Sequence, residues 1–550
     1  MTCHQTLWYL VPAATAEAAE RSFPKGNLYL TIAQKLGPIF TNPDFADLYI
    51  HHGRPAESPA RLALVLVFQH IERLSDADAA EAVRARLDWK YALALDLDDP
   101  GFEASILSTF RARLLASGAE ERLLTIVLDT LGDAKLLKER GRQRSDSTHV
   151  LGQLRTLSRL ALVGETLRAA LNDLAEVAPD WLLAHLDPAW AERYAVRVEE
   201  YRLPKATEDR KLLEVTIGTD GDALLNAVFA ADAPPDRWQR PAVQILRQIW
   251  LQQDDGPHDV RWRSRDDLPP HALLLTSPYE TEARFATKRE TSWTGYKVHL
   301  SETCDDDQPH LMTNVETTPS TTNDVGVTET IHAHLAERDL LPTEHLVDTG
   351  YVASEVLVAS QQQDIDLVGP ALSDNSWQAR QPDGLDLRCF AINWEAQQVI
   401  CPAGKVRVRW TPGVDTQGVR QDIIAVQFDP DDCRDCPVRP RCTQAKTGPR
   451  TMRLRPQDQH EALQHARKRQ VTEAFKELYA ARSGIEGTLS QGVRAFGLRS
   501  ARYRGQAKTH LQHILVAIAI NLVRVFAWIQ EIPRAVTRQS SFARLVESCA

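Results

Sequence analysis

One carboxylate in the C-terminal part of the sequence lies in a strongly basic stretch. Glu486 is the only acid between Tyr479 and Arg504. Its basic neighbours are Arg482, Arg494, Arg499, Arg502 and Arg504. The absence of Gly and Pro from 459 to 481 predicts a continuous helix, which would place Tyr479, Arg482 and Glu486 on one face. Such a group suits a divalent metal site with phosphates alongside. The alternative is a surface helix with an Arg482–Glu486 pair worth roughly 0.2–0.5 kcal/mol.

Two aspartates earlier in the chain could complete such a site. Residues 141–151 alternate in polarity and contain Thr and Val, which predicts a β-strand that includes Asp146. Residues 344–348 predict a buried strand that ends at Asp348, and Gly350 turns the chain into a helix from Ser354. Open α/β sheets bind ligands at the carboxyl ends of their strands. Taken alone, Asp348 is explained equally well as a helix cap, and for Asp146 a helix cap or turn is commoner than a catalytic role.

Three acids in this order suggest phosphoryl transfer assisted by two metal ions. Such chemistry needs carboxylates that hold ions roughly 3.5–4 Å apart, one activating a water or 3′-hydroxyl and the other stabilising the leaving oxygen. Oxygen ligands suit Mg²⁺. Asp146 and Asp348 on strands and Glu486 on a helix can converge only if sheet and helix pack together, as in a ribonuclease H-like fold.

The remaining pattern predicts an α/β protein with several domains, as its 550 residues require. Strands are expected at 294–302, 311–317 and 365–369, and a helix at 328–338. The expected segments are a helical, possibly DNA-binding N-terminal domain (1–125), the first part of the core (126–155), a mainly helical insertion (156–285), core strands (286–370), a Cys-containing β-rich insertion (371–450), and the core and C-terminal helices (451–535). In the N-terminal domain, Ser58 and Ser75 are expected helix caps. Its helices fit a helix-turn-helix or a bundle that touches no DNA.

Four cysteines in the late insertion could hold a metal ion. Cys401, Cys433, Cys436 and Cys442 supply the four thiolates that tetrahedral Zn²⁺ prefers. Their spacing is not that of a standard zinc finger, because Cys401 has no near partner. Structural zinc is therefore weighed against simple reduced thiols and against an iron–sulfur cluster.

The charge distribution limits where nucleic acid could bind. The net charge of −10 argues against a protein that coats DNA uniformly. Residues 439–508, however, carry 16 Lys and Arg against five acids, a local charge of +11. The apolar run 511–529 is interrupted by His513, Asn521 and Arg524, which predicts a buried helix and no membrane span. With no signal peptide in evidence, a cytoplasmic location is expected.

Several motifs together resemble bacterial insertion-sequence DDE transposases of the IS-four/IS-five-like group, over nearly the whole chain. They are RSDSTHV around Asp146, WTGYKVHLSET at 293–303, HLVDTGYV around Asp348, and YAARSGIEGTLSQGVRAFGLRSARYRG around Glu486. FPKGNLYL and RLALVLVFQHIERLSDADAAEAVRARLDWKYAL look like the N-terminal helical domain of these enzymes. The resemblance implies metal-dependent cleavage of double-stranded DNA at the transposon ends and transfer of the 3′ end to target DNA. It also implies a homodimer in the synaptic complex.

The resemblance also assigns roles to single residues. Asp146, Asp348 and Glu486 would be ligands of Mg²⁺ or Mn²⁺. Tyr479 and Arg482 fit the Y-x2-R-x3-E part of the signature and would touch phosphate or organise the DNA end. The usual Lys seven residues after the Glu is Val493 here, and Arg494 could supply its charge. The further DNA-binding candidates are Lys297, Trp293, Arg499, Arg502 and Arg504.

Three other functions share parts of this pattern. A domesticated DNA-binding regulator would keep the fold without the chemistry. A ribonuclease H-like nuclease would cut DNA but never join ends. A structural helical scaffold would use the cysteines as a metal clip, and it would leave the three acids as a coincidence.

Overall fold

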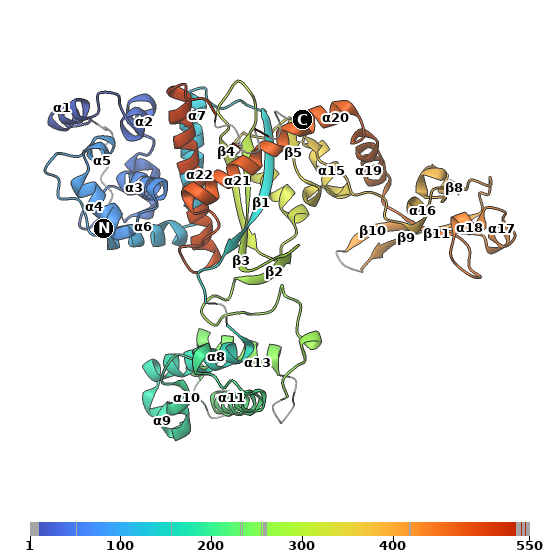
Figure 1. Ribbon diagram of the computed structural model, residues 1–550, viewed down its shortest axis with the longest axis horizontal. Helices are drawn as coiled ribbons and strands as arrows, with labels where there is room; N and C mark the ends of the chain where they lie inside the picture. The colour runs from blue at the N-terminus through green and yellow to red at the C-terminus, as the bar shows by residue number, and fades with distance from the viewer. Residues whose placement is uncertain are drawn as a thin grey trace. The chain divides into compact units, whose positions relative to one another are not determined.

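The computed structural model describes residues 10–534, apart from 51, 156, 231–232, 234, 255, 257–260 and 417–419, together with 541 and 545. The chain divides into two compact units. Figure 1 labels the helices and strands that they contain. Unit 1 comprises residues 1–138, 147–322 and 486–550, and unit 2 comprises residues 139–146 and 323–485. The strand β1 (Arg142–Leu151) contributes its first half to unit 2 and its second half to unit 1.

The N-terminal part of unit 1 is helical, as predicted. Its elements are α1 (Ala13–Ser22), α2 (Leu28–Leu36), η1 (Asn42–Leu48), α3 (Pro59–Glu72), α4 (Asp76–Ala85), α5 (Leu87–Ala92), α6 (Ser105–Ala116) and α7 (Glu120–Asp133). Ser58 caps α3 and Ser75 caps α4 through their side chains, which confirms both expected caps. Phe68 and Trp89 form the buried aromatic centre of this region.

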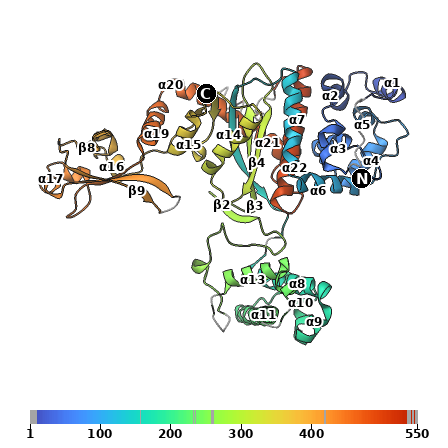
Figure 2. The same ribbon diagram turned by 180° about the vertical axis from the view of Figure 1, so that it is seen from behind.

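Unit 1 also contains an antiparallel sheet and a long apolar helix. The strands are β2 (Arg284–Lys288), β3 (Thr291–Thr303) and β4 (Met312–Pro319), and both β2 and β4 pair with β3. The second half of β1 lies beside β3, and Gly295 permits this approach because a Cβ there would lie 2.2 Å from the Val150 carbonyl oxygen. Helix α22 (Gln506–Ile529) packs against β4, α3 and α7 (Figure 2).

Helix α22 is long and apolar enough to cross a membrane by length and composition alone. Most of it is buried inside the structure, and the core helix of a soluble protein passes the same test. The prediction of a buried helix at 511–529 is therefore confirmed.

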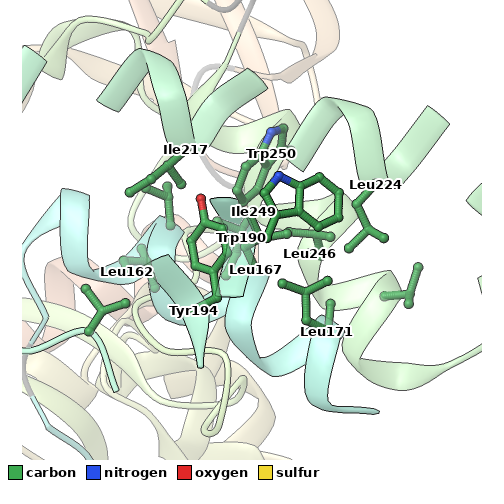
Figure 3. Packing of buried hydrophobic residues seen from close by; sticks show 14 of the residues in the cluster. Leu162, Leu167, Leu171, Trp190, Tyr194, Ile217, Leu224, Leu246, Ile249 and Trp250 are labelled. Carbon is green, nitrogen blue, oxygen red and sulfur yellow. The ribbon is translucent and has the colours of Figure 1, made fainter. Parts of the chain in front are cut away.

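A helical insertion follows β1 in unit 1 and has its own core. It contains α8 (Arg159–Val177), α9 (Pro179–His185), α10 (Pro188–Tyr194), η2 (Glu200–Arg202), α11 (Thr207–Val228), α12 (Pro235–Trp238), α13 (Pro241–Gln253) and η3 (Arg265–Asp267). Figure 3 shows Trp190, Tyr194 and Trp250 packed among leucines and isoleucines of this core. The predicted helical insertion is thus a domain with a separate hydrophobic cluster.

Unit 2 is built on parallel strands. The first half of β1 pairs with β5 (Glu344–Leu346), and β5 pairs with β6 (Asp366–Val368). The helices beside them are η4 (Asp324–Val327), α14 (Thr328–Glu337), η5 (Thr349–Tyr351) and α15 (Ser354–Gln361). The predicted strands and helices are confirmed, but β5 ends at Leu346, two residues earlier than expected.

The Cys-containing region of unit 2 is rich in short strands, as predicted. A three-stranded antiparallel sheet contains β9 (Val408–Asp415), β10 (Gln421–Phe428) and β11 (Thr451–Leu454). A hairpin is formed by β7 (Ala391–Asn393) and β8 (Gln398–Ile400). The short helices here are α16 (Trp377–Arg380), η6 (Leu387–Cys389), α17 (Pro430–Arg434) and α18 (Arg439–Cys442).

The prediction of one continuous helix over 459–481 is wrong. The chain forms α19 (Gln457–Arg469), α20 (Glu473–Ala480), the 3-10 turn η7 (Ala481–Ser483) and then α21 (Gly484–Phe496). Thr472 interrupts the helix because it takes an extended conformation, and its side chain accepts the Phe475 N–H as an N-cap. Tyr479, Arg482 and Glu486 therefore belong to three successive elements and do not share one regular helical face.

Candidate active site

Asp146 lies on β1, whereas Asp348 lies two residues after the end of β5, the parallel strand that pairs with β1 in unit 2. Arg142 is aligned with Glu344 and Arg144 with Leu346. The register ends at this pair, and Asp146 and Asp348 each follow it by two residues, Asp146 on β1 and Asp348 in the turn after β5. The two aspartates thus follow the last aligned pair of neighbouring strands, at the carboxyl end of β5.

Asp146 is held by an arginine from the turn before Glu486. Arg482 Nη2 lies 2.7 Å from Asp146 Oδ2, and both side chains are largely buried. The two residues are 336 positions apart in sequence. Arg482, which was predicted to touch phosphate or organise the DNA end, thus forms a direct ion pair with Asp146.

A second arginine, Arg144, fixes the same turn. Arg144 lies two residues before Asp146 on the same face of β1, and it donates a 2.5 Å hydrogen bond to the carbonyl oxygen of Ala481 in η7. Its guanidinium lies against Gly484, where a Cβ would come within 2.1 Å of Nη1. A larger residue at this position would require the Arg144 guanidinium to move. Sequence reasoning missed Arg144, although its i−2 spacing from Asp146 on a strand was a usable signal.

Asp348 caps the turn that follows β5. Its Oδ1 accepts the Gly350 N–H at 2.9 Å. Asp324 at the start of η4 faces the same glycine, because a Cβ on Gly350 would lie 3.0 Å from Asp348 Oδ1 and 3.2 Å from Asp324 Oδ2. Asp324 is therefore a further acid near Asp348 that the sequence alone did not single out.

The opposite face of these strands carries a chain of hydrogen bonds. Ser145 Oγ lies 2.7 Å from His345 Nε2, and His345 Nδ1 lies 2.8 Å from His332 Nε2 on α14. Burial lowers the pKa of His332 to about 4 and that of His345 well below its ordinary value. Both rings are therefore neutral near pH 7 and belong to the interior that supports Asp146.

Glu486 is an exposed residue in the first turn of α21, and its helix is fixed in unit 1 by a buried ion pair. Thr488 donates a hydrogen bond to Glu302 Oε2 at 2.7 Å, and Arg524 of α22 lies 2.6 Å from the same oxygen. Glu302 is fully buried on β3. This network positions the helix that carries Glu486, and sequence reasoning did not identify it.

The other predicted DNA-binding residues differ in their exposure and in their contacts within the protein. Arg494 is exposed on α21, and Arg504 is exposed with its guanidinium over the Tyr279 ring. The residues with intramolecular partners are Arg499 (Thr148 Oγ1), Arg502 (Leu74 carbonyl), Lys297 (Thr322 carbonyl) and Tyr479 (stacked on Phe475). Trp293 is buried and its indole donates to the Tyr296 carbonyl, which argues against direct base contact.

The four cysteines of the late insertion line one small cavity. Cys401, Cys433, Cys436 and Cys442 surround a volume of about 20 Å³. The Lys405 N–H donates to Cys401 Sγ at 3.3 Å, and the Arg450 guanidinium donates to the Cys442 carbonyl. Burial raises the pKa of the Cys442 thiol, and the nearby thiols add to this effect. The four thiols thus line the same cavity, and the metal ion predicted for them stays a prediction.

Among the residues that the structure describes, no group of three or more His, Cys, Asp or Glu side chains is already arranged to hold a metal ion. The donor types nevertheless fit the expected metals. Asp146 and Asp348 offer the hard oxygens that Mg²⁺ takes, and Mg²⁺ commonly keeps several waters and binds through one or two carboxylates.

Two segments of the chain are similar to known transposase families. Residues 17–113 match the family described as "Transposase domain (DUF772)", and residues 400–526 match the "Transposase DDE domain". No curated protein matches the chain. The two matches support an insertion-sequence DDE transposase, which is an enzyme of the polynucleotidyl transferase and nuclease type that acts on DNA and generally uses divalent metal ions. Neither match specifies the IS-four/IS-five-like subgroup.

Proposed function

We propose, on the premise that this chain is a DNA transposase of the DDE type, that Asp146, Asp348 and Glu486 bind the metal ions for its reaction. The reaction is cleavage at the transposon ends, followed by transfer of the freed 3′-hydroxyl into double-stranded target DNA. The observation that carries this proposal is the pairing of β1 with β5, because Asp146 and Asp348 each follow the last aligned pair of these strands by two residues. Glu486 is included because it follows Arg482, the partner of Asp146, by only four positions.

Each residue of the proposed site has a separate task. Mg²⁺ or Mn²⁺ would supply an activated oxygen nucleophile and stabilise the leaving oxygen. The Asp146 and Asp348 carboxylates would provide the negative charge that holds the ions. Arg144 and Gly484 fix the turn that leads to Glu486, and the Glu302–Arg524 pair fixes its helix. Positioning of this kind is worth several kcal/mol of a reaction barrier, roughly 7–11 where alignment is complete.

The proposed fold of the catalytic part is ribonuclease H-like. The antiparallel β3–β4 pair, the parallel strands β1, β5 and β6, and the flanking helices are the elements that such a core requires. Because two transposon ends must be held together during strand transfer, we propose a homodimer that works in the cytoplasm. The exposed Arg494 and Arg504 are the strongest candidates for contacts with DNA phosphates.

We further propose that Cys401, Cys433, Cys436 and Cys442 hold a structural Zn²⁺. Zinc–thiolate bonds of about 2.3 Å require the four side chains to draw together around the cavity that they line. Elemental analysis of purified protein should find one zinc per chain, and Cys436→Ser should lose it. Zinc-free protein with an unchanged melting temperature would dismiss this site.

The experiment that tests the transposase reaction combines labelled transposon-end DNA, Mg²⁺ and a target plasmid. The native chain should give joined product. Asp146→Asn, Asp348→Asn and Glu486→Gln should each abolish cleavage while end binding survives. Glu81→Gln, which breaks an exposed ion pair with Arg84, serves as the control and should retain full activity.

The outcomes separate the competing functions. Cut but unjoined DNA would indicate a nuclease, and a mobility shift without cutting would indicate a regulator. Substantial cleavage by any one of the three acid variants would remove that residue from the proposed site.

A further inference from the structure

The carboxylate of Asp146 already faces a cation in this structure. The Arg482 guanidinium lies 2.7 Å from Asp146 Oδ2, and the two side chains keep only 14% and 12% of their exposure. Water and salt screen a pair this buried much less than a surface pair. A divalent ion that approaches Asp146 therefore meets a resident positive charge.

The turn that carries Arg482 does not depend on this pair for its position. Arg144 donates to the Ala481 carbonyl, and its guanidinium fills the space left by Gly484. Arg144 is more deeply buried than Arg482, with 5% exposure. The Arg482 side chain can thus leave Asp146 while the Arg144 contact keeps η7 against β1.

Asp146 Oδ2 cannot bind a divalent ion and also keep its present contact with the Arg482 guanidinium. A Mg²⁺ ligand oxygen lies about 2.0–2.1 Å from the ion, which would bring the ion next to the guanidinium that now contacts this oxygen. The displaced guanidinium then needs another anion. A DNA phosphate presents oxygens that arginine binds with the same forked geometry as a carboxylate.

We propose that Arg482 is an exchangeable counter-ion of Asp146, displaced when a divalent ion takes the carboxylate and a DNA phosphate takes the guanidinium. The exchange breaks and forms no covalent bond, and charge is balanced on both sides. The metal ion frees the Arg482 guanidinium for a DNA phosphate, and the phosphate frees the Asp146 carboxylate for the metal ion. Each ligand therefore strengthens the binding of the other. This inference rests on the proposed function, because it requires Asp146 to be a metal ligand.

The test is a calorimetric titration of the DNA-free, full-length protein with Mn²⁺. Arg482→Gln removes the resident charge and should strengthen Mn²⁺ binding by about tenfold, within the range typical of coupled sites. Arg482→Lys keeps the charge without the planar fork and should give a smaller gain. The matched control is Arg434→Gln, which removes an arginine from an exposed pair with Asp431 and should leave Mn²⁺ affinity unchanged.

A second titration includes a short random-sequence DNA duplex. The duplex should tighten Mn²⁺ binding to the native protein and have little effect on the affinity of Arg482→Gln, whose counter-ion is already absent. Circular dichroism of each variant confirms that it is folded, and Arg482→Lys provides the decisive comparison if the glutamine variant is not.

Asp146→Asn separates failure of this inference from failure of the proposed function. If Asp146→Asn binds Mn²⁺ as tightly as the native protein, Asp146 is not a metal ligand, and both are overturned. If Asp146→Asn loses Mn²⁺ but neither Arg482 variant gains affinity, Arg482 is a structural partner, and only the exchange is overturned.

Discussion

Asp146 and Glu302 are both buried carboxylates on β-strands, and each is paired with an arginine distant in sequence. Glu302 is fully buried, and its two partners, Arg524 and Thr488, are also hydrogen-bonded to each other. Asp146 is slightly exposed, and its partner Arg482 belongs to a three-residue turn. The first pair fastens helices together in unit 1, whereas the second neutralises a carboxylate that we propose for metal binding. Similar ion-pair distances thus serve different purposes, and burial and connectivity distinguish them.

The largest expected effect on stability comes from breaking the Glu302–Arg524 ion pair. Glu302→Gln leaves the Arg524 charge without its buried counter-ion, and it should lower the free energy of unfolding by about 3–5 kcal/mol. Urea denaturation followed by circular dichroism measures this loss. Glu81→Gln, which removes a pair whose glutamate is 63% exposed, should change stability by less than about 1 kcal/mol. An equally small loss of unfolding free energy in both variants would mean that the Glu302 network does not stabilise the fold.

A smaller effect is expected at the turn beside Asp146. Gly484→Ala places a Cβ into the Arg144 guanidinium and should cost about 1–3 kcal/mol of unfolding free energy. Gly487→Ala in the same helix is the matched control, because its Cβ would meet no atom within 4 Å. That control should be stabilising by roughly 0.5–1 kcal/mol, since glycine disfavours helix interiors. Loss of stability in both variants would show that helix α21 tolerates no side chain at either position, whatever Arg144 does.

Asp146→Asn should cost less than Glu302→Gln. Asparagine keeps the shape and one acceptor oxygen, and Arg482 can turn toward water, so about 1–2 kcal/mol of unfolding free energy should be lost. Comparison of the two urea midpoints measures the difference. A loss as large as that of Glu302→Gln would make the Asp146–Arg482 pair a fixed structural link and would remove the contrast between the two regions.

The smallest expected effect is the contribution of His332 to acid sensitivity. Its folded pKa of about 4 lies below the usual 6.5, so the unfolded chain binds the proton first as pH falls. Stability is therefore complete above pH 6.5 and declines below it, by about 1 kcal/mol per such histidine between pH 6.5 and 5.5. His332→Gln should reduce the decline by this amount in urea titrations at the two pH values. An unchanged pH dependence would show that this ring takes up its proton at the same pH in the folded and the unfolded protein.

Local patterns were sufficient to predict many elements but few of the contacts at the site. The polar alternation around Asp146 correctly predicted β1, and Ser58 and Ser75 correctly predicted two helix starts. The helix break at Thr472 was missed, although Thr followed by Glu is itself an N-cap signal. The bond from Arg144 to Ala481 joins residues 337 positions apart, and no local pattern carries that information. The pairing of β1 with β5, which Asp146 and Asp348 each follow by two residues, likewise depends on strand register, which only the folded sheet reveals.

The helical insertion leaves and rejoins its sheet at one place. Gly152, just after β1, donates to the Thr294 carbonyl, and Arg284 at the start of β2 is aligned with the next residue, Gly295. Closing a loop costs only about 0.6 kcal/mol more with each doubling of its length. The connection between β1 and β2 can therefore be a short turn or contain a whole domain. We therefore expect residues 159–275, which contain the insertion's own core, to be exchangeable, whereas Glu280 must stay because it accepts a hydrogen bond from the buried Tyr296 hydroxyl of β3. A fluorescent protein with closely spaced termini could be grafted in their place without shifting β1 against β3.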